Sequence, residues 1–112
     1  MQTITLGESS LECSRLAYGC WRVTGVINHP PIDDKHEKKG REAIAAAYEV
    51  GYTLFDLADI YSDGLVEEVF GRTLKEVPGM RDNIIITTTP TTTTIIITII
   101  LILILIIVSL SV

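Results

Sequence analysis

The sequence lacks several features that would assign a chain of 112 residues to a common class. It has only two cysteines, too few for a disulfide framework, and Cys13 and Cys20 are expected to be free thiols. It has no excess of basic residues, and its net charge of −5 argues against a nucleic-acid partner. Met1–Ser10 has neither a basic start nor an apolar run. No signal peptide is therefore predicted, and a cytoplasmic location is expected.

Charge is missing altogether from the C-terminal part of the chain. All 23 charged side chains lie in residues 1–82, and none lies in residues 83–112. Those last 30 residues consist almost entirely of Ile, Leu, Val, Thr and Ser. The first part therefore has the composition of an ordinary globular protein, whereas the second is low-complexity sequence.

Three interpretations of this uncharged tail stay open. Ile95–Val108 is nearly all apolar, which would suit a membrane anchor and a membrane-anchored location. Against a membrane span, the segment is largely β-branched, lacks interfacial Trp or Tyr, and has Arg81 as its one flanking base. The favoured interpretation is low-complexity sequence in place of further fold. The third is a buried strand or a self-associating β-rich chain, because β-branched residues favour extended structure in water.

Residues 1–88 alternate between strand-like and helix-like patterns. Two short alternating runs around a Gly/Ser turn predict a hairpin in residues 3–13. Apolar runs and helical periodicity predict the remaining elements: buried strands at Leu16–Trp21, Thr53–Ile60 and Asn83–Thr88, helices at Arg41–Val50 and Leu65–Val77, and a loop at Thr24–Gly40. Strands that alternate with helices predict βαβ units and a parallel sheet, and hence an α/β fold.

The clearest chemical feature is a pair of acids in the middle strand. Asp56 and Asp59 interrupt an apolar run, and Tyr61 follows just past its end. A buried carboxylate is costly unless it is paired or hydrogen-bonded. In parallel α/β folds the carboxyl ends of the strands form the active site, where a carboxylate and a phenol would suit acid–base chemistry. The alternative is a capping aspartate beside a packing tyrosine.

These residues are part of a longer resemblance to a known family. Asp56–Tyr61 (Asp-Leu-Ala-Asp-Ile-Tyr) resembles the Asp-Thr-Ala-Asp-x-Tyr signature of the aldo-keto reductases. Gly19–Arg22 resembles the family's Gly-Thr-Trp-type loop. Arg41–Asp56 resembles its first helix running into strand two, and Leu65–Gly71 resembles its second helix. The N-terminal hairpin resembles the one that closes the bottom of that family's barrel.

The resemblance implies a fold as well as an activity. Residues 1–88 would form the opening βα units of a (β/α)8 TIM-type barrel with an N-terminal hairpin, followed by a Thr/Ile/Leu tail in residues 89–112. The length of 112 residues is too short for a complete barrel, which needs about 200 or more. The implied reaction is the reversible NADP(H)-dependent reduction of a small aldehyde or ketone to an alcohol.

The resemblance also implies roles for single residues. Tyr61 would be the catalytic proton donor to the carbonyl oxygen, and Asp56 would be a catalytic acid that orients and tunes its partners. Asp59 would be structural. Gly19, Trp21 and Arg22 would lie near the nicotinamide or the substrate. No metal site is implied.

The sequence departs from the family's pattern at one important position. Family members place a lysine at the end of strand three, where its ammonium brings the pKa of the tyrosine toward the working range. Thr89 stands at that position here, and a hydroxyl supplies no charge. Asp56 would then be an unpaired carboxylate, and its charge would raise the pKa of Tyr61.

Other parts of the family's site have no counterpart in the sequence. The catalytic histidine after strand four is missing, and His29 and His36 are expected to be solvated loop residues. Most contacts to the adenosine phosphate come from later strands in this family, and the sequence has no Gly-x-Gly-x-x-Gly fingerprint. The chain as given is therefore expected to bind NADPH very weakly and to be inactive.

Overall fold

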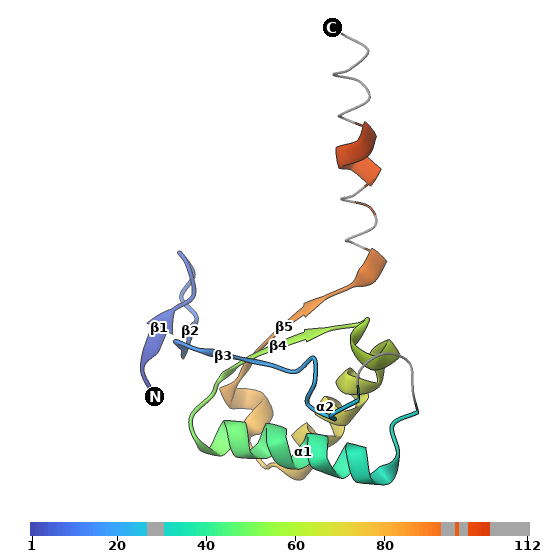
Figure 1. The fold of residues 1–112 in the computed structure, drawn as a ribbon. Coiled ribbons are helices and arrows are strands. Elements are labelled where there is room, and N and C mark those ends of the chain that lie inside the picture. The colour runs from blue at the N-terminus through green and yellow to red at the C-terminus, as the bar shows by residue number, and fades with distance from the viewer. Residues whose placement is uncertain (27–30, 93–95, 97–98, 104–112) are drawn as a thin grey trace, which may run out of the picture.

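The computed structural model describes residues 1–26, 31–92, 96 and 99–103, and it places two helices on one face of a parallel sheet (Figure 1). The chain begins with an antiparallel hairpin of β1 (Thr3–Thr5) and β2 (Glu12–Ser14). The parallel sheet has the order β3 (Ala17–Gly19), β4 (Leu54–Ala58) and β5 (Ile85–Thr89). Helix α1 (Asp34–Glu49) connects β3 to β4, and α2 (Leu65–Glu76) connects β4 to β5. The predicted hairpin and parallel βαβ units are confirmed.

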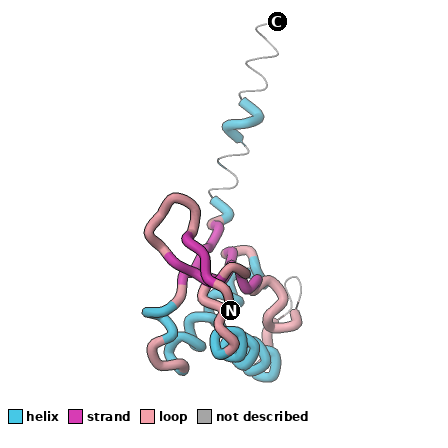
Figure 2. The backbone as a smooth tube through the Cα atoms, turned by 90° about the vertical axis from the view of Figure 1, so that its left-hand side faces the viewer, coloured by secondary structure: helices cyan, strands magenta, loops and turns pink. Residues whose placement is uncertain are grey.

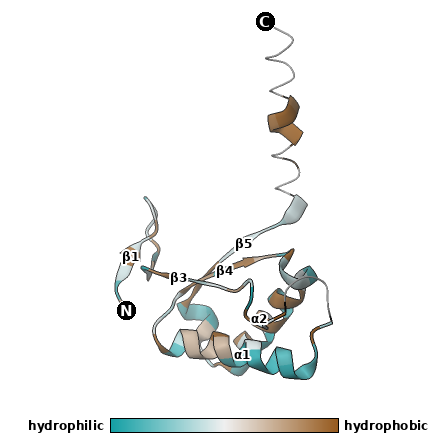
Figure 3. Cartoon of the chain, viewed as in Figure 1, coloured by the Kyte–Doolittle hydropathy of each residue, from teal (hydrophilic) through white to brown (hydrophobic). Residues whose placement is uncertain are grey.

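The helix-facing side of the sheet forms the core. Tyr18, Phe55 and Ile86 lie side by side across the three strands. The ring of Phe55 is fully buried, with its centroid 5.3 Å from that of Phe70 in α2 and 5.8 Å from that of Tyr18. Further core residues come from both helices and from β4: Ile44, Ala47, Leu57, Val66 and Val69. Apolar residues of both helices, coloured toward brown in Figure 3, pack into this core because burial removes them from water.

Ser14 fastens the hairpin to the amino end of the sheet. Its buried hydroxyl accepts hydrogen bonds from the backbone N–H groups of Thr53 at 3.0 Å and Leu54 at 3.2 Å. Its own N–H donates to the Thr53 hydroxyl at 2.8 Å. The hairpin loop projects away from the helices (Figure 2), and its base lies where β4 begins. This is the end of the sheet at which the resemblance places such a hairpin.

Helix α1 is longer than predicted. It begins at Asp34 rather than Arg41, so the predicted loop at Thr24–Gly40 is wrong for residues 34–40. The Asp33 carboxylate caps the helix by accepting a hydrogen bond from the His36 N–H at 2.8 Å. The first turns of α1 are polar and lack an apolar stripe, so hydrophobic periodicity did not predict them. Residues 27–30 of the predicted loop lie outside the described part of the chain.

The strands differ from the prediction in length and in burial. The predicted strand Leu16–Trp21 is reduced to β3, and its residues are not buried on both faces, since Ala17 and Gly19 are exposed. Among the described residues, helices cover only one face of the sheet. The third strand begins at Ile85, after a short 3-10 turn, and ends at Thr89. The proposed division into residues 1–88 and 89–112 stays a prediction.

The described residues of the tail are helical. Residues 91, 92, 96 and 99–103 have helical backbone, and the side chains of Ile99–Leu103 are exposed. The extended structure favoured by the β-branched composition is therefore not found there. A helix satisfies its own backbone hydrogen bonds, whereas a lone strand would leave them unpaired. Most of Ile95–Val108 lies outside the described residues. Within the part that the structure covers, no helix is both long and apolar enough to cross a membrane.

Candidate active site

Tyr61 lies at the carboxyl edge of the sheet because the chain turns sharply after β4. Tyr61 opens a short 3-10 turn in which Ser62 and Asp63 have φ values of 48° and 56°. This left-handed backbone is uncommon for residues other than glycine. The Ser62 hydroxyl donates to the carbonyl of Val26 at 3.3 Å, which helps to hold the turn. Strained backbone of this kind is concentrated at functional sites.

Asp56 projects from β4 onto the face of the sheet opposite the helices. Its register neighbours are Gly19 in β3 and Thr87 in β5. The Thr87 hydroxyl donates to Asp56 Oδ1 at 3.0 Å, and Tyr61 lies close enough for the charge of the same carboxylate to raise the pKa of its phenol. The structure therefore brings together the two residues that the sequence suggested for acid–base chemistry.

The surroundings of Tyr61 keep its phenol protonated. Burial raises the pKa of Tyr61, and the charge of Asp56 raises that pKa further. The sequence predicted this direction from Asp56 alone, whereas the structure adds burial as the larger cause. Burial and the charge of Asp56 also raise the pKa of Cys20 to about 12, so this buried thiol stays neutral at ordinary pH.

A hollow of about 260 Å³ lies beside Tyr61 at the carboxyl ends of β4 and β5. It is lined by Ala58, Asp59, Ile60, Tyr61, Thr89 and Thr91. Thr89 pairs with Ala58, two residues along from the pair of Asp56 and Thr87, so it faces the same side of the sheet as Asp56. Over the described ranges, no lysine or arginine forms an ion pair with Asp56. The edge therefore has an acid and a phenol but no paired cation.

Asp59 lines the same hollow as Tyr61, and its carboxylate has a structural partner. Its carboxylate accepts hydrogen bonds from the Thr91 N–H at 2.7 Å and from the Thr91 hydroxyl. These hydrogen bonds lower the pKa of Asp59. Its backbone N–H donates to the carbonyl of Thr89 at 3.4 Å. Asp59 thus fastens the end of β4 to the chain that follows β5.

The residues suggested for the cofactor lie at and after the carboxyl end of β3. Gly19 lies beside Asp56 in the sheet, Trp21 is half exposed, and the Arg22 guanidinium lies 4.8 Å from the centroid of the Trp21 ring. The role of Gly19, Trp21 and Arg22 near the nicotinamide or the substrate stays a prediction. No cluster of His, Cys, Asp or Glu suited to a metal occurs among the described residues.

The structure places His36 away from Asp56, and it gives Asp56 two neighbours that the sequence did not suggest. His36 is not in a loop as predicted: it lies in the first turn of α1, with Nδ1 2.6 Å from the carboxylate of Asp33. His29 lies outside the described residues. Sequence reasoning missed Thr87 and Cys20 as neighbours of Asp56. Their relation to Asp56 depends on the register of three strands, which the sequence does not state.

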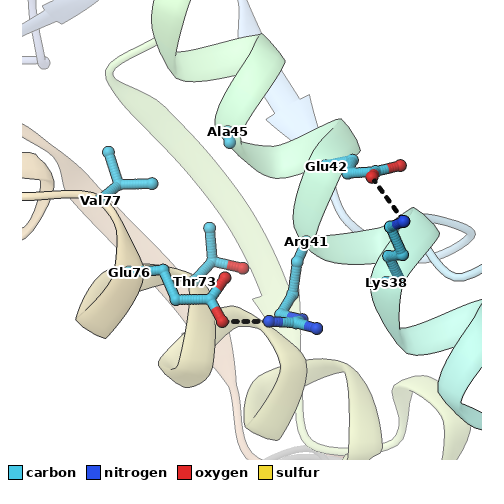
Figure 4. A pocket seen from close by; sticks show the side chains of 7 residues that line it. All are labelled: Lys38, Arg41, Glu42, Ala45, Thr73, Glu76 and Val77. Atoms are coloured by element: carbon cyan, nitrogen blue, oxygen red, sulfur yellow. Dashed lines mark hydrogen bonds and ion pairs between the residues drawn. The ribbon is translucent and has the colours of Figure 1, made fainter.

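A second hollow, of about 270 Å³, lies between α1 and α2 (Figure 4). Its charged side chains form ion pairs with one another. Lys38 is 3.8 Å from Glu42, and Arg41 pairs with Glu76 across the two helices. Because these charges already balance, the hollow is a joint between helices rather than a candidate site.

Comparison with known proteins identifies the family. The model of the aldo/keto reductase family matches residues 15–90. A 6-dehydroglucose reductase of Agrobacterium fabrum is 40% identical and an aldo-keto reductase of Bacillus subtilis is 34% identical, each over 88 residues that make up 79% of this chain. The chain spans about a quarter of the length of these relatives, 27% and 25% respectively.

A solved structure supports the same assignment. The thermostable aldo-keto reductase Tm1743, solved with the inhibitor epalrestat, has a TM-score of 0.68 and 28% identity, over 80% of this chain and 31% of that protein. The described strands and helices thus have the arrangement of the opening βα units of an aldo-keto reductase barrel. The chain belongs to the aldo/keto reductase family.

Proposed function

We propose that the carboxyl edge of this sheet belongs to an NADP(H)-dependent carbonyl reductase site, with Tyr61 as the proton donor and Asp56 as its partner. We further propose that the chain as given does not turn over, because Thr89 supplies no cation. The observation that supports both statements is that the charge of Asp56 raises the pKa of Tyr61 beside a hollow that Thr89 also lines. The substrate class is a small aldehyde or ketone.

The proposed chemistry explains why the missing cation matters. In this family the bound cofactor supplies a hydride to the carbonyl carbon. Tyr61 would donate its phenolic proton to the carbonyl oxygen and be left as a phenolate. A general acid works best when its pKa lies near the working pH, whereas burial and Asp56 raise the pKa of Tyr61. An ammonium at position 89 would oppose that effect by favouring the phenolate.

Turnover and cofactor binding are tested first on the chain as it exists. NADPH oxidation with a reactive aromatic aldehyde is expected to proceed no faster than without protein. A fluorescence titration with NADPH is expected to show no saturation at micromolar concentrations. Clear turnover that Tyr61→Phe abolishes would overturn the proposed inactivity and would support the role of Tyr61.

The effect of the missing cation is tested by Thr89→Lys. The new ammonium should lower the pKa of Tyr61, measured by NMR of ¹³C-labelled tyrosine across pH. The matched control is Thr88→Lys, because Thr88 faces the other side of the sheet and its hydroxyl donates to Glu67 at 2.6 Å. If Thr89→Lys leaves the Tyr61 titration unchanged while the protein stays folded, the missing cation is not the limiting defect.

A further inference from the structure

Thr87 contacts the acid of the proposed site, although nothing in the sequence singles it out. It pairs with Asp56 across β4 and β5, and its hydroxyl donates to Asp56 Oδ1 at 3.0 Å. The same hydroxyl also lies 3.4 Å from the carbonyl oxygen of Phe55, which is a longer hydrogen bond. The shorter contact is a hydrogen bond to a charged acceptor, which is the stronger kind.

We propose that Thr87 is a positioning residue that fixes the carboxylate of Asp56 in its place beside the phenol of Tyr61. The inference rests on the proposed function, because it assigns Thr87 a part in that site. Thr87 acts through Asp56 and does not itself meet the substrate. A cation at this site would donate a hydrogen bond to Asp56 and would also supply positive charge. The Thr87 hydroxyl donates a hydrogen bond to one carboxylate oxygen but adds no charge.

The other described neighbours of Asp56 do not provide the same contact. The charge of Asp56 acts on Tyr61 and on Cys20, which are the titratable groups found around it. The Cys20 thiol is directed to the carbonyl of Tyr18, with its sulfur 3.7 Å from that oxygen. The side-chain donor to the carboxylate in the described structure is therefore the hydroxyl of Thr87.

The geometry of Thr87 suits a positioning role. It lies within a strand, and a β-branched side chain on a strand has few accessible rotamers. Its hydroxyl is therefore directed along the sheet toward β4 with little freedom. The next residue, Thr88, has the same chemistry but faces the helices and donates to Glu67. The two adjacent threonines provide a matched pair on opposite faces of one strand.

The test removes the hydroxyl and keeps the shape. Thr87→Val should lower the pKa of Tyr61 toward its ordinary value, because a carboxylate that Thr87 no longer holds in place acts less strongly on the phenol. Thr87→Ser should restore the parent titration, and Thr88→Val should leave it unchanged. The measurement is NMR of ¹³C-labelled tyrosine in the full chain, with Tyr61 assigned from Tyr61→Phe.

The outcomes separate positioning from folding. The resonances of Tyr18 and Tyr52, which are packed edge to face 5.5 Å apart, report whether the core is intact. An unchanged Tyr61 titration in folded Thr87→Val would overturn the inference. Should Thr87→Val unfold, Thr87→Ala removes the same hydroxyl with a smaller side chain, and the same change in the Tyr61 titration is expected. In an Asp56→Asn background, Thr87→Val should have no further effect on Tyr61, and a further shift would count against action through Asp56.

This experiment is independent of turnover, so the two proposals can fail separately. A Tyr61 titration that responds to Thr87→Val upholds the positioning role even if Tyr61 proves not to be a proton donor. Conversely, reductase activity that depends on Tyr61 upholds the proposed function even if Thr87→Val leaves the titration unchanged.

Discussion

The two faces of the three-stranded sheet are built for different purposes. On the helix-facing side, Phe55 and its neighbours are apolar and buried, and they pack against both helices. On the other face and at the carboxyl edge, Asp56, Thr87 and Thr89 are polar and at least partly exposed. The helix-facing side provides most of the stability of the fold, because burial of apolar surface is the main stabilising effect in a small domain. The open face carries the groups that could do chemistry, so stability and activity can be altered separately.

The largest expected effect comes from the helix-facing side. Phe55→Ala should lower the free energy of unfolding by about 3–5 kcal/mol, because it leaves a cavity among Tyr18, Phe70 and the helices. Urea unfolding followed by circular dichroism measures the change. The control is Val50→Ala, whose side chain is 66% exposed and whose loss should cost less than about 0.5 kcal/mol. Similar midpoints for the two variants would mean that this side of the sheet does not hold the fold together.

A smaller effect compares two helical glycines. A Cβ on Gly40 would lie 3.1 Å from Val69 Cγ1 and 3.2 Å from Thr24 Cγ2, whereas a Cβ on Gly71 meets nothing within 4 Å. Gly71→Ala should therefore stabilise the protein by about 0.5–1 kcal/mol through helix propensity. Gly40→Ala should be less favourable by about 1–3 kcal/mol, because overcrowding offsets that gain. Thermal unfolding of both variants tests the difference, and equal melting temperatures would contradict close packing of α1 against α2.

The two helices differ in how well the sequence predicted them. Helix α2 was predicted closely because its apolar residues repeat at helical spacing and Pro78-Gly79 ends it. The first turns of α1 were missed because they are stabilised by the Asp33 cap and by the ion pair between Glu37 and Arg72 of α2. The cap is a local signal with little periodicity, and the ion pair exists only once the two helices have packed together.

The candidate site was predictable in its residues and not in its contacts. Asp56 and Tyr61 stood out because polar side chains interrupt or follow an apolar strand, and the family signature named them. Thr87 did not stand out because it is one threonine among several. Its contact with Asp56 depends on the register of β4 and β5, and a shift of one residue would turn Thr87 toward the helices. Residue type can suggest chemistry, whereas register decides which residues meet.

The smallest expected effect concerns the join between the carboxyl edge and the tail. Hydrogen bonds from Thr91 lower the pKa of Asp59 in the folded protein below its ordinary value of 3.8. The stabilisation from this carboxylate is therefore present above pH 4 or so and is lost as the pH falls through the lowered pKa. Asp59→Asn should weaken the same join at neutral pH, because the amide has no charge.

Amide hydrogen exchange at Thr91 measures this effect, since its N–H donates to Asp59 Oδ2. Its protection, corrected for the intrinsic pH dependence of exchange, should decrease on acidification in the parent chain and should depend much less on pH in Asp59→Asn. The core amides of β4 should respond little, because Asp59 contacts the chain after β5 rather than the helices. Equal losses at Thr91 and in β4 would show that the carboxyl edge and the helix-facing side open together. In that case the two faces of the sheet would be one cooperative unit, and polar substitutions at the edge would also alter the stability of the core.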